Sequence, residues 1–319
     1  MSGNSNPFPG AAPRSPDLTL CEIEPIQSPG AIQPHGAVLA ALADGLRVTH
    51  ASANLATILG RPAEAVLGRP LEEAIGAAAL RAVLNAMSSD DAEPGRVHPL
   101  PVTDDGMFVL CANRSGHLIC IDIEPVSPDT GQGPPIILAQ SVLQTFRHAT
   151  TRGELCALAV RGLKAITGYD RVMAYRFHED GHGEVIAEAR EESLEPFLGL
   201  HYPASDVPPQ ARRLYLRQSV GSIADASYQA VPLLIDSASD DGTPLDLTHS
   251  ALRSASPIHR EYMRNMNTAA SLTIGLPRRQ RPEGRPARTT AMPVICGECW
   301  FAITRHRGFP DRRCARSRA

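Results

Sequence analysis

The stretch from His201 to Pro209 constrains the local fold more tightly than any other part of this chain, and it reads His-Tyr-Pro-Ala-Ser-Asp-Val-Pro-Pro. Two consecutive prolines fix φ and remove two backbone donors, so they cannot continue a strand. Val207, Ala211 and Leu214 have helical spacing. We therefore predict a stiff loop that leads into a helix over residues 210–218, with Ser205 or Asp206 as its N-cap.

This loop would bring an aromatic ring, a carboxylate and free backbone groups to one place. Such a place suits a ligand that is rich in N–H donors. The residue types alone favour a plainer interpretation, which is an ordinary junction between a loop and a helix.

The segment Pro203–Pro208 resembles the PASDIP signature of bacterial phytochromes, with Val207 in place of isoleucine. Three further segments agree with that family in the same order: Cys21-Glu22 ahead of residues 29–36, then residues 169–173, then residues 259–266. The resemblance covers about residues 18–276, and these motifs do not recur widely. It implies a photoreceptor for red and far-red light that forms the sensory input of a two-component signalling protein.

The resemblance implies an α+β fold, a PAS domain followed by an incomplete GAF domain, each with a central antiparallel sheet and flanking helices. We expect a disordered leader over residues 1–17, the PAS domain with its N-terminal anchor segment over 18–126, a linker over 127–135 and the GAF domain over 136–276. Periodicity and turn residues predict strands at 37–42, 46–50, 107–112, 117–123, 171–177, 183–190 and 269–276, and helices at 53–59, 71–87 and 136–147, from 151 and from 257.

A linear tetrapyrrole needs an acceptor for its pyrrole N–H groups, partners for two propionates, an apolar slot and a covalent anchor. The resemblance implies that the backbone carbonyl of Asp206 accepts from the pyrrole nitrogens and that His259 holds a water nearby and exchanges a proton. It also implies the following contacts: Arg253, Ser256, Ser271 and Thr273 with the propionates; Met173, Tyr175, Tyr202 and Tyr262 around the ring that isomerises; and Ser205, Val207, Pro208, Tyr215 and Arg217 in the loop and the helix behind it.

Each of these residues has an ordinary alternative role. A histidine such as His259 on an amphipathic helix is more often a surface or core residue, Met173 and Tyr175 alternate on a strand as core residues do, and Arg253 could be a solvated charge. Their joint occurrence in the family's order favours the functional interpretation.

Cys21 is the expected covalent anchor. Plant-type phytochromes carry their thiol directly before the helix histidine, and that position here is Ile258, which cannot react. Cys21 stands at the bacterial position, where an exposed thiolate can add to a vinyl group. The resemblance therefore implies biliverdin IXα rather than a reduced bilin. Cys111, Cys120 and Cys156 fall within predicted elements and are expected to be packing residues.

One departure from the family lies inside the matching region. The second propionate arginine, which usually follows the run at Tyr215–Arg217, is replaced by Ser219-Val220-Gly221. A guanidinium clamp is therefore missing, and Arg217 is the nearest substitute.

Residues 277–319 differ from the family. They hold eleven arginines against Glu283, Glu298 and Asp311, a balance of +8, which leaves −11 for the rest of a chain with net charge −3. Such a run could be a nucleic-acid arm, and Cys296-x-x-Cys299 could bind zinc, although no second ligand pair stands at a usual spacing. The codons that can encode residues 296–304 can also be read in the frame that starts one base earlier. In that frame they permit the family's last strand, Leu-Trp-Gly-x-x-x-Cys-His-His.

From these codons we predict a frameshift in the tail. The GAF domain would then lack its last strand, and the chain would lack the following PHY domain and the histidine kinase output. Neither a nucleic acid nor a metal is expected as a partner.

Composition limits the remaining possibilities. No apolar run approaches the roughly 18–20 residues that span a bilayer, and residues 1–16 do not resemble a signal peptide. We expect a cytoplasmic protein with no membrane partner, with reduced thiols among its seven cysteines. A homodimer is a further expectation, and a response regulator would be the partner only of a full-length form.

No glycine-rich nucleotide loop or kinase core is visible, so we do not expect an enzyme. Two alternatives stay open. The first is a PAS–GAF sensor module for another small molecule. The second is a hydrolase triad of Ser205, Asp206 and His259, although no nucleophile elbow surrounds Ser205.

Overall fold

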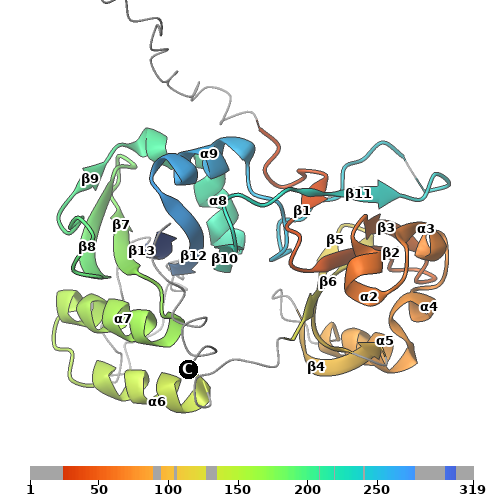
Figure 1. The fold of residues 1–319 in the computed structure, drawn as a ribbon, viewed down its shortest axis with the longest axis horizontal. Helices are drawn as coiled ribbons and strands as arrows, with labels where there is room; N and C mark the ends of the chain where they lie inside the picture. Colours follow the sequence, from red (N-terminus) through yellow and green to blue (C-terminus); the bar gives the residue numbers. More distant parts are fainter. Residues whose placement is uncertain are drawn as a thin grey trace, which may run out of the picture.

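In the computed structural model the chain forms two α+β domains that lie side by side (Figure 1). The structure describes residues 24–88, 95–103, 106–126, 135–207, 209–218, 220–239, 241–276 and 299–306. The expected leader, residues 127–134 of the expected linker, Cys21 and Pro208 lie outside these ranges. Within them, no helix combines the length and the apolar character needed to cross a membrane.

The first domain is a sheet with short helices packed on one face. Its core consists of side chains from both layers, among them the fully buried Leu39, Leu55, Leu71 and Ile121. The predicted helix over 71–87 is wrong as a single element, because Gly76 has φ of +83° and divides it in two. The elements are β1 (Ala31–Ile32), β2 (Ala37–Leu42), β3 (Val48–Ser52), α2 (Leu55–Leu59), α3 (Ala63–Val66), α4 (Leu71–Ile75), α5 (Ala77–Ala86), β4 (Gly95–Thr103), β5 (Gly106–Ser115) and β6 (Leu118–Pro125).

A strand from the second half of the chain completes this sheet. Strand β11 (Val231–Ile235) pairs antiparallel with both β1 and β3, which gives the order β1-β11-β3-β2-β6-β5-β4. In Figure 1 this strand lies along the first domain, beside β1 and β3. The sequence did not predict that β11 joins the first sheet. A five-residue apolar strand does not reveal which distant strands it will pair with.

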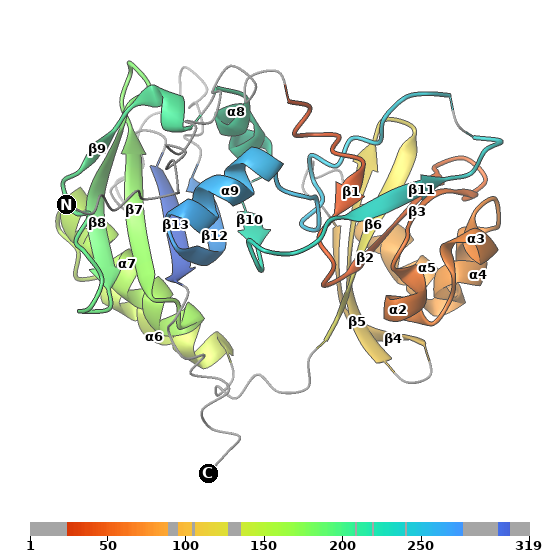
Figure 2. The same ribbon diagram turned by 45° about the horizontal axis from the view of Figure 1, so that its top comes forward.

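The second domain has a six-stranded sheet in the order β10-β12-β13-β7-β8-β9. Helices α6 and α7 pack on one face, and α8 and α9 lie on the opposite side (Figure 2). The elements are α6 (Pro135–Phe146), α7 (Arg152–Thr167), β7 (Arg171–Phe177), β8 (Gly183–Arg190), β9 (His201–Tyr202), α8 (Pro209–Arg217), β10 (Val220–Ile223), α9 (Pro257–Asn265), β12 (Thr268–Leu276) and β13 (Cys299–His306).

The expectation that this sheet lacks its last strand is wrong. Strand β13 comes from the basic tail and lies between β12 and β7, with antiparallel pairing on both sides. The run Trp300-Phe301-Ala302-Ile303-Thr304 is apolar enough to fill a central position, and Ile303 is fully buried. A difference from the family motif therefore did not mean the loss of the strand. The reading frame of the gene itself stays a prediction.

Side chains from the first domain also enter the segment between β10 and α9. The buried Gln33 donates from Nε2 to the Ser222 carbonyl (2.7 Å) and accepts from the Ala224 amide (3.1 Å). Buried Asp122 accepts from the Ser250 hydroxyl and the Ala251 amide, both at 2.6 Å. These contacts and β11 join the two domains through backbone as well as side-chain interactions.

The helix ends follow the sequence in two cases and not in a third. Thr151 and Glu154 form the predicted capping box of α7, and the Ser256 side chain caps α9. The predicted cap of α8 is wrong. Residues Ala204–Asp206 form a 3-10 turn, and α8 begins only at Pro209. The second of two prolines suits a first helical position, which moves the start beyond Ser205 and Asp206.

Candidate functional site

The two faces of the second sheet have different chemistry. On one face Val172, Ala174, Ala187 and Ile303 are buried in the core that includes α7. Residues directly opposite each other on neighbouring strands share a face, and that face alternates along each strand. The other face therefore carries Met173, Tyr175, Ser271 and Thr273, which the sequence selected.

Strand β13 contributes two residues to this second face that sequence reasoning missed. Ala302 lies opposite both Thr273 and Met173, and Thr304 lies opposite Ser271. The small or hydroxyl-bearing side chains Ser271, Thr273, Ala302 and Thr304 line the middle of the sheet there. Sequence reasoning misses them because the tail differs from the family's motif for the last strand.

Three tyrosines converge beside this face. The Tyr175 ring lies 5.0 Å from the Phe177 ring and 6.1 Å from the Tyr202 ring, centroid to centroid. Burial, followed by the nearby charge of Asp206, raises the pKa of Tyr175 to about 12. Burial and then Asp206 also raise the pKa of Tyr262. Asp206, Tyr175, Tyr202 and Tyr262 thus form one electrostatically connected group, and the sequence had assigned all four to the site.

Gly183 allows the Tyr175 ring to take this position. A Cβ atom built on Gly183 would lie 1.8 Å from Cζ of Tyr175, which is far inside van der Waals contact. Because the ring occupies the space above Gly183, no other residue fits there without moving Tyr175.

His259 belongs to the same group through α9. Its ring stacks on that of Tyr262, with centroids 6.4 Å apart and planes 19° apart. The surrounding protein desolvates the imidazole and lowers the pKa of His259, although its side chain remains accessible to solvent. The ring is therefore partly desolvated by its neighbours while its side chain still meets solvent.

A buried ion pair that sequence reasoning missed positions Tyr202. Arg171 and Glu188 lie 3.5 Å apart with side chains only 2% and 4% exposed. Glu188 accepts from the Phe197 and Leu198 amides (2.9 and 3.1 Å), and Arg171 donates to the Glu195 carbonyl at 2.6 Å. These bonds fix the loop that leads directly into β9.

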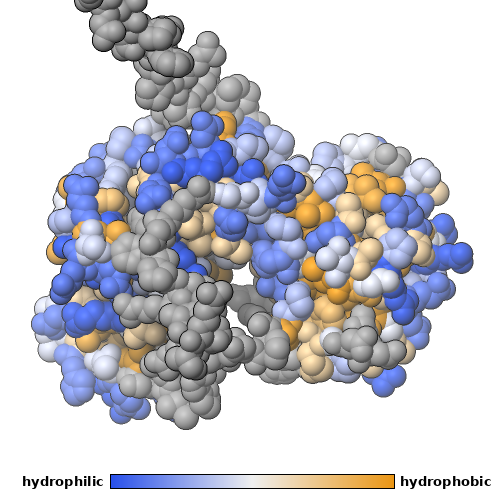
Figure 3. Space-filling view, viewed as in Figure 1, coloured by the Kyte–Doolittle hydropathy of each residue, from blue (hydrophilic) through white to orange (hydrophobic). Residues whose placement is uncertain are grey.

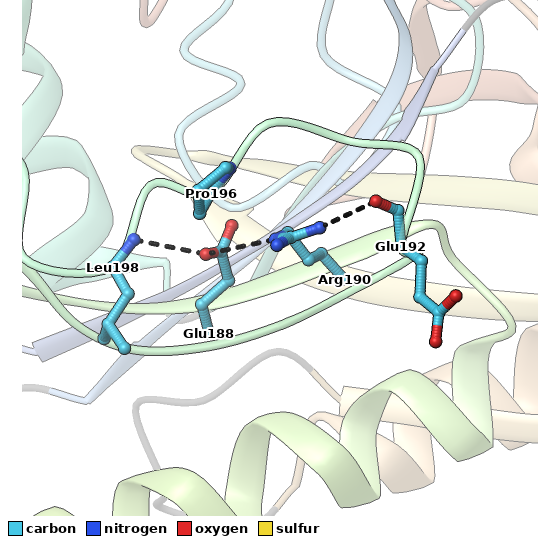
Figure 4. Close-up of a pocket in the computed structure, with 5 residues that line it drawn as sticks. All are labelled: Glu188, Arg190, Glu192, Pro196 and Leu198. Carbon is cyan, nitrogen blue, oxygen red and sulfur yellow. Dashed lines mark hydrogen bonds and ion pairs between the residues drawn. The ribbon is translucent and has the colours of Figure 1, made fainter.

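Figure 4 shows Glu188 and Arg190 pointing toward this loop across a hollow of about 380 Å³, which Glu192, Pro196 and Leu198 complete. Two glutamates in its wall make it unsuited to a ligand that carries propionates. The hollow is therefore part of the structure that holds the loop in place, and it is not the expected ligand site.

The remaining predicted residues are less closely gathered. Ser256 donates to the Glu24 carboxylate (2.5 Å), and Arg253 donates to the Thr248 carbonyl (3.4 Å). Arg217 is exposed at the end of α8, Ser205 is exposed and Val207 is half-buried. Tyr215 lies on α8, but its side chain is not among those described, and Cys21 and Pro208 lie outside the described residues.

Gly221 is one of the three residues, Ser219 to Gly221, that were expected to replace the family's second arginine. It lies on β10 opposite Thr273 of β12, where it brings no side chain to this face.

The residues present fit a linear tetrapyrrole in three respects. Tyr262 is 41% exposed although it belongs to the tyrosine group, which leaves apolar surface for a ligand to cover. The neighbouring protein partly desolvates the Asp206 carboxylate and raises its pKa although the side chain is exposed, so its surroundings favour a proton or a donor from a ligand. The middle of the sheet offers small hydroxyl side chains that can bind carboxylates.

Comparisons with known proteins agree with this architecture. Residues 21–126 match a family model described as a PAS fold. The bacteriophytochrome of Pseudomonas aeruginosa is 37% identical over 260 residues, which cover 81% of this chain and 35% of that protein. The bacteriophytochrome of Xanthomonas campestris pv. campestris is 38% identical over 295 residues, 86% of this chain and 42% of that protein.

Solved structures extend the likeness to both domains. The chromophore binding domain of Stigmatella aurantiaca phytochrome P1 superposes with a TM-score of 0.75 at 35% identity, covering 91% of this chain and 93% of that one. The chromophore-binding domain of the bacteriophytochrome RpBphP3 from R. palustris gives 0.73 at 29% identity, with 93% of each chain covered.

The first sheet with β11 in it, the second sheet, and the aromatic group on the side of the second sheet where α8 and α9 lie define a tandem PAS–GAF sensor protein. More particularly, the chain belongs to the phytochrome family, because it matches nearly the whole of a solved phytochrome domain at 35% identity. It spans 35% and 42% of the length of the two bacteriophytochromes above.

Proposed function

We propose that this chain is the chromophore-binding, light-sensing part of a bacterial phytochrome and that it binds biliverdin. The observation that carries the proposal is the convergence of Tyr175, Tyr202, Tyr262, Asp206 and His259 on the side of the second sheet where α8 and α9 lie. Biliverdin, when bound, would supply the absorption of red light and the double bond that isomerises.

The residues of the chain would divide the remaining tasks. The Asp206 carbonyl would accept from the pyrrole N–H groups, with His259 beside it to hold a water and exchange a proton. Arg253, with Ser256, Ser271 and Thr273, would bind the propionates. Met173 and the three tyrosines would surround the moving ring and exclude water from it.

We further propose a thioether at Cys21. The thiolate sulfur would form a bond to one vinyl carbon, the vinyl double bond would become single, and the other vinyl carbon would take a proton. The contact between Glu24 and Ser256 supports this assignment, because it ties the chain to the N-terminus of α9. Glu24 lies three positions after Cys21, and three extended residue steps reach at most about 11 Å.

A zinc-fluorescence gel tests the anchor. After incubation with biliverdin and denaturing electrophoresis, the parent and Cys111→Ser should fluoresce, whereas Cys21→Ala should not. An equally bright Cys21→Ala band would overturn the assignment of the anchor.

One observation favours an alternative ligand. Gly221 leaves the site without the family's second guanidinium, so a PAS–GAF sensor for another small molecule stays a second candidate. Absence of any bilin absorbance after incubation would favour it. We also propose that the chain forms a homodimer in the cytoplasm and that this part of the protein has no catalytic activity. A response regulator would be the partner of a longer protein.

A further inference from the structure

Three histidines meet at one end of the second sheet, outside the tyrosine group. His178 directly follows β7, His182 directly precedes β8, and His201 begins β9. Their rings lie 4.1 Å (178 to 182), 5.3 Å (182 to 201) and 6.1 Å (178 to 201) apart, centroid to centroid. One nitrogen from each ring falls within 4.8 Å of the corresponding nitrogens of the other two.

The backbone holds these three residues in place. The His178 amide donates to the His182 carbonyl at 2.9 Å, and the Gly181 amide donates back to the His178 carbonyl at 2.9 Å. Gly181 takes φ of +86°, which allows the tight turn between them. His201 lies directly opposite Glu184 in the pairing of β9 with β8. This pairing fixes the backbone of His201 relative to the other two histidines.

Two carboxylates each contact one nitrogen of a different ring. Asp180 Oδ1 lies 2.5 Å from Nδ1 of His182, and Glu184 Oε2 lies 3.0 Å from Nε2 of His178. This leaves Nε2 of His182 and Nδ1 of His178 for another partner. Histidines that bind a metal usually donate their other N–H to a carboxylate, which orients the ring and makes it more basic.

The charges around the cluster are balanced. The Arg176 guanidinium is paired with Glu184 (2.5 Å), and Arg212 reaches the Gly181 carbonyl (3.4 Å). The two carboxylates, Asp180 and Glu184, offset these two cations. An incoming dication therefore meets no net positive charge from these four groups.

We propose that His178, His182 and His201 bind a divalent transition metal ion of the class that prefers imidazole, such as Zn²⁺, Ni²⁺ or Cu²⁺. Three imidazoles with an open fourth position form a recurrent zinc ligand set. Ligand nitrogens about 2.0–2.1 Å from a tetrahedral Zn²⁺ lie roughly 3.3 Å apart. Binding must therefore rotate the parallel rings of His178 and His182 and draw the three nitrogens together.

The bound ion would fasten β9 to the β7–β8 turn. His201 is followed directly by Tyr202, so the ion would also restrict the segment that carries Tyr202. The ion site itself does not rest on the proposed bilin, because all its ligands lie outside the tyrosine group. Spacing alone did not reveal it, since His201 is 19 residues from His182 in the sequence.

The test uses the 319-residue apoprotein with its thiols alkylated, titrated with Zn²⁺ against a chromophoric chelator. The parent should bind one tight equivalent. His182→Gln and His201→Gln should each bind at least about tenfold more weakly, and Asp180→Asn about 10–100-fold more weakly. His117→Gln, at an exposed position in the first domain, should bind like the parent. All variants should melt at the parent temperature without metal.

A Co²⁺ spectrum of the unalkylated protein provides a second measurement. It should show weak visible bands without the intense near-ultraviolet band of a thiolate ligand. No tight equivalent in the alkylated parent, unchanged affinity in either His182→Gln or His201→Gln, or a thiolate spectrum at one equivalent would overturn the proposal.

Discussion

The Asp122 carboxylate of the first domain accepts a hydrogen bond from the Ser250 hydroxyl at 2.6 Å, 128 residues further along the chain. The same carboxylate accepts from the Ala251 amide, also at 2.6 Å. Burial raises the pKa of Asp122 to about 7 in spite of these hydrogen bonds. The contact between the domains therefore contains a carboxyl group that titrates near neutrality.

This pKa predicts how stability depends on pH. In the unfolded chain the carboxyl loses its proton near pH 4, whereas in the folded chain it keeps the proton up to about pH 7. The folded state binds more protons in that window, so the contribution of Asp122 to stability falls as pH rises from about 4 to about 7. Thermal melts should show a flatter pH dependence in Asp122→Asn than in the parent. As a control, Asp44→Asn at an exposed position should keep the parent's slope of melting temperature against pH. If Asp122→Asn also kept the parent's slope, the assignment of this pH dependence to Asp122 would be contradicted.

A second prediction concerns the arginine that the site lacks. Gly221 faces Thr273, so Gly221→Arg would place a guanidinium where a propionate is expected. A hydrogen bond to a charged group contributes about 1.5–3 kcal/mol, so the dissociation constant of biliverdin should fall about tenfold or more in a fluorescence titration. Val220→Arg is the matched control. Its neighbour on β12 is Ile274, in the core on the other face, so it should not tighten binding.

The tail strand yields a third prediction. Ile303 is fully buried between β12 and β7, so Ile303→Ala should lower the free energy of unfolding by about 2–5 kcal/mol. Thr304→Ala on the opposite face of the same strand should cost about 1 kcal/mol or less. Chemical denaturation measures both. Equal and small effects would show that β13 does not belong to the sheet, and the frameshift account of a defective domain would regain support.

His259 provides a fourth prediction. If it lies beside the pyrrole nitrogens, its removal takes away a water and a proton partner from the bound bilin. In His259→Ala the red absorbance should therefore be lost at a lower pH than in the parent, as followed by an absorbance titration. His117→Ala should titrate like the parent, and an unchanged midpoint in His259→Ala would remove that residue from the site.

Local signals predicted much of the second domain. Strands β7 and β8 have the predicted bounds, since their alternation and the intervening turn are contained in about twenty residues. The caps at Thr151 and Ser256 are likewise encoded within four residues. The members of the tyrosine group, which the structure brings together, were also selected from the sequence, although through family motifs rather than periodicity.

Features that depend on distant partners were not predictable in this way. Strand β11 joins the first sheet because β1 and β3 offer it an edge. The Arg171–Glu188 pair holds the loop before Tyr202 only once β7 and β8 are paired. Strand β13 was misjudged because its basic surroundings and divergent motif outweighed a short apolar run. The surface also differs between the two domains. Figure 3 shows hydrophilic side chains over the region of α9 and apolar side chains gathered over the first domain.

The most direct test of the account is the absorbance difference spectrum of the 319-residue chain after incubation with biliverdin. Strand β13 lies between β12 and β7, so the sheet beside the tyrosine group is continuous in the chain as it stands. Red light should deplete a protein-bound red band, far-red light should restore it, and the cycle should repeat. A spectrum that matches free biliverdin and does not respond to either light would contradict the proposal that this chain senses light through a bilin.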